Sequence, residues 1–200
     1  MFEPINYDNQ SILIIANGES VLNHKLGNQI DKFKNVVRIN NYKINNFEIY
    51  SGKKTTIWFN GANQGLIKRT KFPDKIIVSI PSEILMRKKN INSYVANRIK
   101  TKNFKIISID RILEYEKNVG HNRLTTGMYA VMWALENYKN IYIHGYDFFI
   151  NSKGHYFDNK IIKSLKNNNF IHKGKKHNNQ LEKKFMLDLI NSKKINYIIN

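Results

Sequence analysis

The sequence predicts a single-domain α/β fold with a mostly parallel β-sheet, and two observations support this fold class. Short apolar runs bounded by turn residues alternate with helical patterns along the chain. Several runs are apolar at consecutive positions, as strands covered on both faces require. Such alternation is typical of a parallel sheet with helices on each side. The 200 residues contain no repeat or linker and are enough for one domain with its own core.

The predicted strands and helices follow from these patterns. Strands are expected at residues 11–16, 35–40, 55–60, 75–80, 104–109, 140–143 and 195–199. Helices are expected at residues 21–32, 82–99, 127–137 and 179–191. In the last of these, Leu181, Phe185 and Leu189 form one apolar stripe, as in a helix packed against a core.

One long stretch, residues 150–176, has no clear periodicity and is rich in Asn, Lys and Gly. In a compact domain, a loop of this length is usually a functional lid or disordered. His155 and His177 flank much of it. We therefore interpret the stretch as a lid over a site in one domain of residues 1–200, rather than as a linker.

The composition favours a soluble protein with an anionic partner. The formal net charge is +18 and the mean hydropathy is −0.50. A field of one sign concentrates counter-charged ligands, here nucleic acid, an anionic membrane surface or an acidic nucleotide-sugar. Lysines that only solvate the surface, in the product of a nucleotide-biased genome, explain the charge equally well.

Several protein classes are disfavoured by what the sequence lacks. No apolar run is long enough to cross a bilayer, and no secretory signal opens the chain. The expected location is therefore cytoplasmic, with peripheral contact at the inner face of a membrane as one option. The chain has no cysteine, which removes disulfides and thiolate chemistry and permits a reducing compartment.

An Asn lies at or directly after the end of each of the first three predicted strands. The Asn17-Gly18 turn lets the backbone approach a ligand, and the helix after it offers free N–H groups and a positive dipole end. Asn40 and Asn60 end the next two strands, so their amides should lie on the same rim. Asn is also favoured in turns, which is the simpler interpretation from the sequence alone. Asn41 is a rival to Asn40 in this alignment.

Two later motifs also have both a functional and a structural interpretation. Thr126 can cap the helix expected from Gly127, and a hydroxyl beside a helix N-terminus is an anion site. Glu182 can form a capping box with Asn179, but His177 shortly before it favours a role in a site.

Other titratable residues lack such companions. His144 lies inside a predicted strand, so it is interpreted as a packed residue. Asp147 and Asp158 have no partners at ligand spacing, so no metal site is predicted.

The order and spacing of these blocks resemble the sialyltransferases of glycosyltransferase family 29. Residues 11–60 resemble the large sialylmotif, and residues 123–145 are similar to the small sialylmotif, with Thr125-Thr126-Gly127 in place of Ser-Thr-Gly. His155-Tyr156 matches the start of the third motif. His177 and Glu182 match the very small motif, a His and a Glu with four residues between them. The same blocks resemble the bacterial sialyltransferases of family 42.

This resemblance implies a Rossmann-like, glycosyltransferase A-like fold and an inverting, metal-independent sialyltransferase without a cofactor. N-acetylneuraminic acid, or a related nonulosonic acid, would move from CMP–sialic acid to a hydroxyl of a glycan or glycolipid acceptor. His177 would be the general base, because an imidazole with a pKa near about 6.5 accepts a proton at neutral pH. His155 and Tyr156 would stabilise the departing phosphate. The implied substrate-binding residues are Asn17, Gly18, Asn40, Asn60, Thr125, Thr126, Gly127 and Glu182.

The sequence departs from both families. Animal members of family 29 carry a disulfide between the large and small motifs; here packing must replace it, which favours a microbial or viral cytoplasmic enzyme over a Golgi one. Phe149 stands where family 42 has a phosphate-binding tyrosine, so Tyr156 or His155 would have to take its place.

Two alternatives remain at this point. The enzyme alternative is transfer of Kdo from its CMP conjugate. It stays open because the matched motifs recognise the nucleotide of the donor more than its sugar. The non-enzyme alternative is a basic nucleic-acid-binding domain; its aromatic residues lie mainly in apolar elements, and no RNP or helix-turn-helix pattern occurs, which argues against it. Acceptor, linkage and oligomeric state are not fixed by the sequence.

Overall fold

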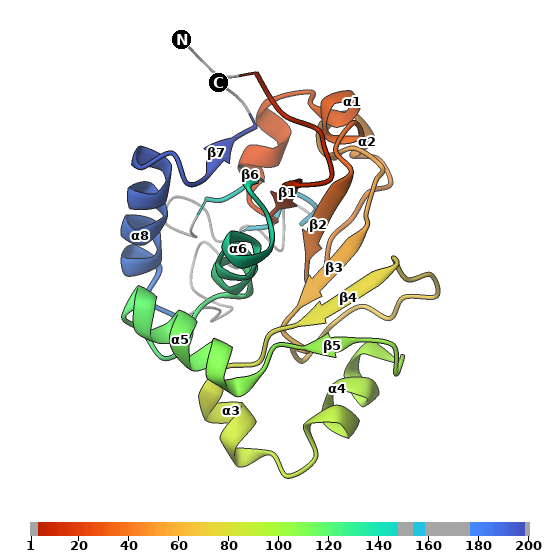
Figure 1. The fold of residues 1–200 in the computed structure, drawn as a ribbon. Helices are drawn as coiled ribbons and strands as arrows, with labels where there is room; N and C mark the ends of the chain where they lie inside the picture. Colours follow the sequence, from red (N-terminus) through yellow and green to blue (C-terminus); the bar gives the residue numbers. More distant parts are fainter. Residues whose placement is uncertain (1–3, 148–153, 159–176, 199–200) are drawn as a thin grey trace.

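The computed structural model describes residues 4–147, 154–158 and 177–198, and its centre is one seven-stranded sheet (Figure 1). The strands are β1 (Ser11–Ile15), β2 (Asn35–Ile39), β3 (Ile57–Asn60), β4 (Lys75–Val78), β5 (Lys105–Ile106), β6 (Asn140–His144) and β7 (Asn196–Tyr197). They lie in the order β5-β4-β3-β2-β1-β6-β7, and each neighbouring pair is parallel. The predicted strand positions and the parallel sheet are confirmed.

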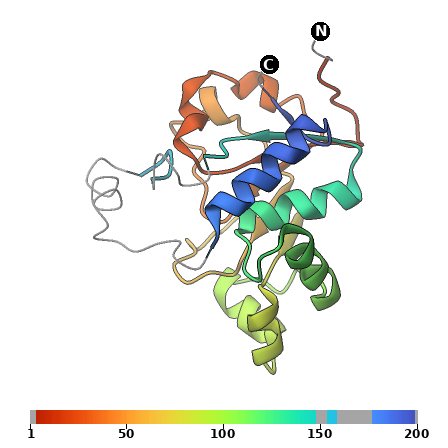
Figure 2. The ribbon, with the colours of Figure 1, turned by 90° about the vertical axis from the view of Figure 1, so that its left-hand side faces the viewer.

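Helices cover both faces of this sheet. They are η1 (Glu19–Asn23), α1 (Gly27–Ile30), α2 (Glu48–Ser51), α3 (Ser82–Arg87), α4 (Ile91–Ile99), α5 (Ile109–Val119), α6 (Thr126–Asn137) and α8 (Asn179–Asn191). Ile112 of α5, Met128 of α6 and Met186 of α8 belong to one core cluster on one face. Figure 2 shows η1 and α1 across the sheet from α6 and α8.

Strand β1 explains why the central strands are apolar at consecutive positions. Ile12 and Ile14 belong to the core cluster that contains α6, whereas Leu13 and Ile15 pack in a second cluster that contains Phe33. Successive side chains of a strand point to opposite faces. A strand covered on both faces therefore buries every side chain, and all of β1 is buried.

Two predicted helices are interrupted. The helix expected at residues 82–99 is two helices, because Lys88 is extended (φ −96°, ψ 109°) and Asn90 starts α4 by accepting a hydrogen bond from Ser93 N at 3.0 Å. The helix expected at residues 21–32 is the short pair η1 and α1. In both cases a local cap or a change of direction breaks an otherwise helical pattern.

Helices α2 and α5 were not predicted. In α5 the buried residues Ile112, Tyr115, Glu116 and Val119 follow helical spacing. The strand expected at residues 104–109 includes Ile109, the first residue of α5, so the start of this helix could not be recognised. None of the described helices combines the length and apolarity that crossing a membrane requires.

The strand order places a crevice beside β1. The chain adds β2 to β5 on one side of β1 and then returns to its other side with β6. At such a reversal, neighbouring loops diverge beyond the carboxyl ends of the strands, where α/β folds bind ligands. The fold therefore predicts a ligand site at the carboxyl ends of β1, β2 and β6.

Candidate functional site

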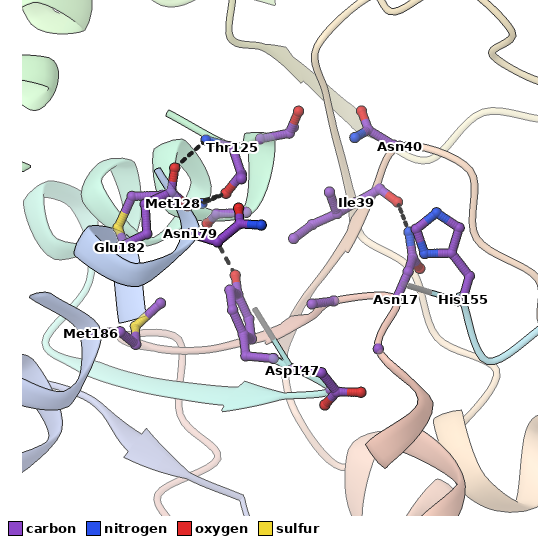
Figure 3. Close-up of a pocket in the computed structure, with 17 residues that line it drawn as sticks. Asn17, Ile39, Asn40, Thr125, Met128, Asp147, His155, Asn179, Glu182 and Met186 are labelled. Atoms are coloured by element: carbon purple, nitrogen blue, oxygen red, sulfur yellow. Dashed lines mark hydrogen bonds between the residues drawn. The ribbon is translucent and has the colours of Figure 1, made fainter. Parts of the chain in front are cut away.

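A pocket opens at this crevice and is called the first pocket (Figure 3). It encloses about 110 Å³ and is lined from the three strand ends, the start of α6, one face of α8 and the segment at His155. The predicted site residues that line it are Asn17, Gly18, Asn40, Thr125, Thr126, Gly127, His155 and Glu182. In Figure 3, Asn17, Asn40 and His155 form one side, opposite Thr125 and Glu182.

Asn17 is fixed across the gap between β1 and β2. Its Nδ2 donates to the carbonyl oxygens of Ile39 and Asn41, each at 2.9 Å (Figure 3 shows the first bond). Its Oδ1 is buried and has no hydrogen-bond partner within the described part of the chain. Because buried polar atoms are nearly always paired, this oxygen is available to a ligand hydroxyl or amino group.

Gly18 is required by a close approach from the end of β6. A Cβ at this position would lie 2.4 Å from Asp147 Cγ and 2.5 Å from the carbonyl oxygen of Gly145. Asp147 comes this close because its carboxylate accepts hydrogen bonds from the backbone N–H of Ser20, at 3.0 Å, and from the Ser20 hydroxyl. From the sequence, Asp147 is tested only as a metal ligand, because Ser20 lies 127 residues away and no local spacing indicates their contact.

Asn40 adopts a left-handed backbone conformation at the pocket rim, with φ 47°. Asn tolerates this region better than most residues. Its Oδ1 accepts a hydrogen bond from Gly61 N at 3.0 Å, which leaves Nδ2 as the amide group without a partner among the described residues. The rival Asn41 instead contacts Gly65 and Ile67 through its side chain and does not line the pocket.

Asn60 occupies a different position from the one predicted. It is fully buried, does not line the pocket, and its Oδ1 accepts a hydrogen bond from Ala62 N at 3.1 Å. This side chain stabilises the turn after β3, as the simpler sequence interpretation proposed. The structure does not bring it together with Asn17 and Asn40 in the pocket lining.

The start of α6 presents free donors to the first pocket. Thr125, rather than Thr126, is the N-cap, and its Oγ1 accepts a hydrogen bond from Met128 N at 3.2 Å. In the portion of the chain that is described, the N–H groups of Thr126 and Gly127 have no hydrogen-bond partner. Free N–H groups and the helix dipole favour an anion at this position.

Glu182 supports this helix start from α8. Its Oε1 accepts a hydrogen bond from Thr125 N at 2.7 Å, and its Oε2 accepts one from Thr125 Oγ1 at 2.6 Å (Figure 3). The alternative interpretation of Glu182 as part of a capping box with Asn179 is not what the structure shows, because Asn178 caps α8 and the Glu182 carboxylate contacts Thr125 at the start of α6. Burial raises the pKa of Glu182, and the two bonds from Thr125 oppose that rise. Glu182 is thus a positioning residue in this structure.

His155 and Tyr156 have separate surroundings. The His155 ring lines the first pocket and stacks on Phe157 at 5.3 Å. Tyr156 is buried in the second core cluster, where its hydroxyl contacts the backbone of Lys43. It does not line the pocket, and a hydroxyl held in this way is poorly placed to replace the family 42 tyrosine.

His177 lies in a neighbouring pocket rather than in the first. This second pocket encloses about 330 Å³ beyond the ends of β3 and β4, and Thr126 lines both pockets. His177 Nδ1 lies 2.8 Å from the carbonyl oxygen of Arg123. A carbonyl only accepts hydrogen bonds, so Nδ1 carries the proton and Nε2 keeps a lone pair. The ring is therefore oriented as a base.

The pH dependence of activity should report this environment. Burial lowers the pKa of His177 from its ordinary value of 6.5, the bond to the Arg123 carbonyl opposes this, and the charge of Arg123 adds to it. We expect kcat/KM to rise with pH through a midpoint below 6.5 and to be level at pH 7. A pH–rate profile measures this, and an acid limb above pH 6.5 that His177→Gln removes would contradict the lowered pKa.

Other predictions concern residues around the two pockets. His144 is buried at the end of β6, which confirms the packed role. Burial lowers the pKa of its imidazole to about 4. Within the described residues, no three His, Asp or Glu side chains gather in a group that could hold a metal ion.

Most of the predicted lid at 150–176 lies outside the described residues. Asn179, one turn before Glu182, also lines the first pocket and was missed as a site residue.

Comparisons with known proteins agree with this arrangement. The sequence profile of glycosyltransferase family 29 (sialyltransferase) matches residues 6–75 and 69–194. A mammalian sialyltransferase in complex with Gal-beta-1-3GalNAc-ortho-nitrophenol is similar with a TM-score of 0.69 and 17% identity, covering 94% of this chain and 69% of that one. The sialyltransferase CstII from Campylobacter jejuni, in complex with CMP-3FNeuAc, has a TM-score of 0.61 and 20% identity, covering 94% and 80%. No protein with a curated description matches the sequence. The shared fold confirms the predicted fold class.

Proposed function

This chain belongs to glycosyltransferase family 29, the sialyltransferases, and we propose that its two pockets divide the substrates of sialyl transfer between them. The first pocket would hold the CMP–sialic acid donor, and the second pocket would hold the acceptor glycan. The observation that carries this proposal is the position of Thr126, which lines both pockets. The start of α6 is then where the two substrates meet.

The first pocket offers groups suited to the donor. Asn17 Oδ1 is an open acceptor and Asn40 Nδ2 an open donor, a complementary pair for the base edge or the ribose hydroxyls of cytidine. The free N–H groups of Thr126 and Gly127 suit an anionic group, which the donor supplies as its phosphate or its carboxylate. His155 lies on the opposite side, where it can stabilise a departing phosphate.

The second pocket offers the base. His177 Nε2 would take the proton of the acceptor hydroxyl as that oxygen forms a bond to the anomeric carbon of the sialic acid. The bond from this carbon to the CMP phosphate oxygen breaks, and its electron pair leaves with CMP. A single displacement of this kind inverts the anomeric configuration.

Binding of CMP should stabilise the protein. A ligand that binds only the native state adds about 2.7 kcal/mol to the unfolding free energy at a concentration of 100 Kd. We expect CMP to raise the melting temperature in a thermal-shift assay, and Asn17→Ala to reduce this shift. AMP and GMP at the same concentration are the controls. Equal shifts with all of these nucleotides would contradict a cytidine site.

Release of CMP from the donor tests the proposed function directly. The protein is incubated with CMP–N-acetylneuraminic acid, with and without lactose, and the released CMP and the sialylated product are measured. Parallel reactions contain CMP–Kdo as donor, and further reactions contain EDTA to test the predicted independence from metals. Acceptor-dependent release from CMP–N-acetylneuraminic acid supports the proposal. Release from CMP–Kdo alone would favour transfer of that sugar instead.

A further inference from the structure

The second pocket contains an arginine that the reaction described above does not use. Arg98 of α4 lines this pocket together with Arg123 and His177. Its guanidinium lies over the Tyr94 ring, 4.4 Å from the centroid, and Tyr94 lines the same pocket. Stacking of this kind holds an arginine side chain in place while leaving its N–H groups free to bind a ligand.

The two arginines of the second pocket differ in their charge balance. Arg123 forms an ion pair with Glu83, so its charge is compensated. Arg98 has no carboxylate within ion-pair distance among the residues described. The pocket lining itself contains no Asp or Glu. The segment 159–176, which precedes His177, also has none in its sequence. Within the part of the chain that the structure describes, the Arg98 charge in the second pocket therefore has no counter-charge.

We infer that the second pocket selects an acceptor carrying a negative charge near the hydroxyl that is sialylated, and that Arg98 binds this charge. A concave site of one sign attracts oppositely charged ligands, and a guanidinium binds carboxylate and phosphate with two parallel hydrogen bonds. This inference rests on the proposed function, because it places the acceptor beside His177.

The carboxylate of the donor sugar is the other source of such a charge. The N–H groups of Thr126 and Gly127, two residues that line the first pocket, can bind that carboxylate, as proposed above. Arg98 lines only the second pocket of the two. An acidic sugar at the end of the acceptor, such as the sialic acid of 3′-sialyllactose, therefore accounts for Arg98 better than the donor does.

The test compares a neutral and an anionic acceptor in the same CMP-release assay. Lactose and 3′-sialyllactose are titrated at a fixed donor concentration, and the donor is titrated at a fixed acceptor concentration. The variants are Arg98→Gln, which removes the charge, and Arg98→Lys, which keeps the charge without the planar fork. Arg87→Gln is the matched control, because Arg87 is exposed at the end of α3 and does not line the pocket. Melting temperatures confirm that each variant is folded.

We expect the wild type to use 3′-sialyllactose with a lower KM than lactose. Arg98→Gln should raise the KM for 3′-sialyllactose by about 10- to 100-fold, the range expected for a lost hydrogen bond to a charged group. Its KM values for lactose and for the donor should stay within about twofold of wild type, by the same reasoning. The KM of Arg98→Lys for 3′-sialyllactose should lie between those of the wild type and Arg98→Gln. The KM values of Arg87→Gln should match those of the wild type.

Each other outcome has a defined meaning. A raised donor KM in Arg98→Gln would assign the arginine to the donor carboxylate and overturn the inference. Equal use of the two acceptors by the wild type, with CMP released, would overturn the inference while leaving the proposed function intact. If the wild type released no CMP with lactose and none with 3′-sialyllactose, both the inference and the proposed function would be overturned.

Discussion

Replacing His177 by alanine is expected to lower kcat for sialyl transfer by roughly 10²- to 10⁴-fold, the usual cost of losing a general base. The ring is held by its bond to the Arg123 carbonyl, so that Nε2 is free to accept the acceptor proton. His177 lies in the second pocket, and the donor groups line the first. Affinity for CMP, measured by thermal shift, should therefore change little while turnover is lost.

Two other histidines serve as comparisons. His155→Ala should lower both kcat and CMP affinity, because His155 lines the first pocket. His24→Ala is the matched control, since His24 is exposed and lines neither pocket. Turnover at the wild-type level in His177→Ala would exclude it as the base. If His172→Ala alone abolished transfer, the base would lie before the lysines at 173–176 and the motif alignment would be wrong.

The strands could be predicted from the sequence because burial on two faces leaves a simple pattern. Strand β1 is apolar over residues 12–15, and the structure buries every one of these side chains. Short helices leave no comparable signal. A helix of four residues such as α1 is held by tertiary packing rather than by propensity. At Gly27, a Cβ would lie 2.0 Å from the carbonyl oxygen of Glu48, so α1 depends on its contact with α2.

Part of the site could be predicted because the carboxyl ends of parallel strands lie along the same edge of the sheet. Asn17 and Asn40 follow this reasoning and meet in the first pocket. Asn60 follows the same reasoning but is fully buried. In a strand covered on both faces, the sequence cannot tell which side chain at its end turns toward a ligand. The sequence also treated His155 and His177 as parts of one site, whereas the structure assigns them to two adjoining pockets.

Long-range contacts between carboxylates and the starts of helices could not be predicted. Three carboxylates each accept hydrogen bonds from both the N–H and the hydroxyl of one Ser or Thr at the start of a helix. These pairs are Asp147 with Ser20, Glu116 with Ser82, and Glu182 with Thr125. The partners are 127, 34 and 57 residues apart, so no local spacing signals them. They fix the starts of η1, α3 and α6, which surround the two pockets.

Glu182 provides the strongest test of this arrangement. Glu182→Ala would remove the buried carboxylate and leave the half-buried N–H and hydroxyl of Thr125 without their acceptor. A buried polar group left unpaired costs about 1–3 kcal/mol. We expect the unfolding free energy to fall by an amount within this range of about 1–3 kcal/mol, and kcat to fall with it, because the N–H groups of Thr126 and Gly127 would lose their position.

Glu182→Gln separates positioning from charge. The amide oxygen can accept from Thr125 N while the amide nitrogen donates to Thr125 Oγ1, which preserves both contacts without the carboxylate. We therefore expect Glu182→Gln to retain most of the stability and kcat that Glu182→Ala loses. In a double-mutant cycle, Glu182→Ala should lower the unfolding free energy less in a Thr125→Val background than in the wild type. The expected coupling energy is about 0.5–3 kcal/mol. Denaturant unfolding and steady-state kinetics measure these quantities. Equal losses of kcat in the Gln and Ala variants, with unchanged stability, would instead show that the charge of Glu182 acts on the substrate.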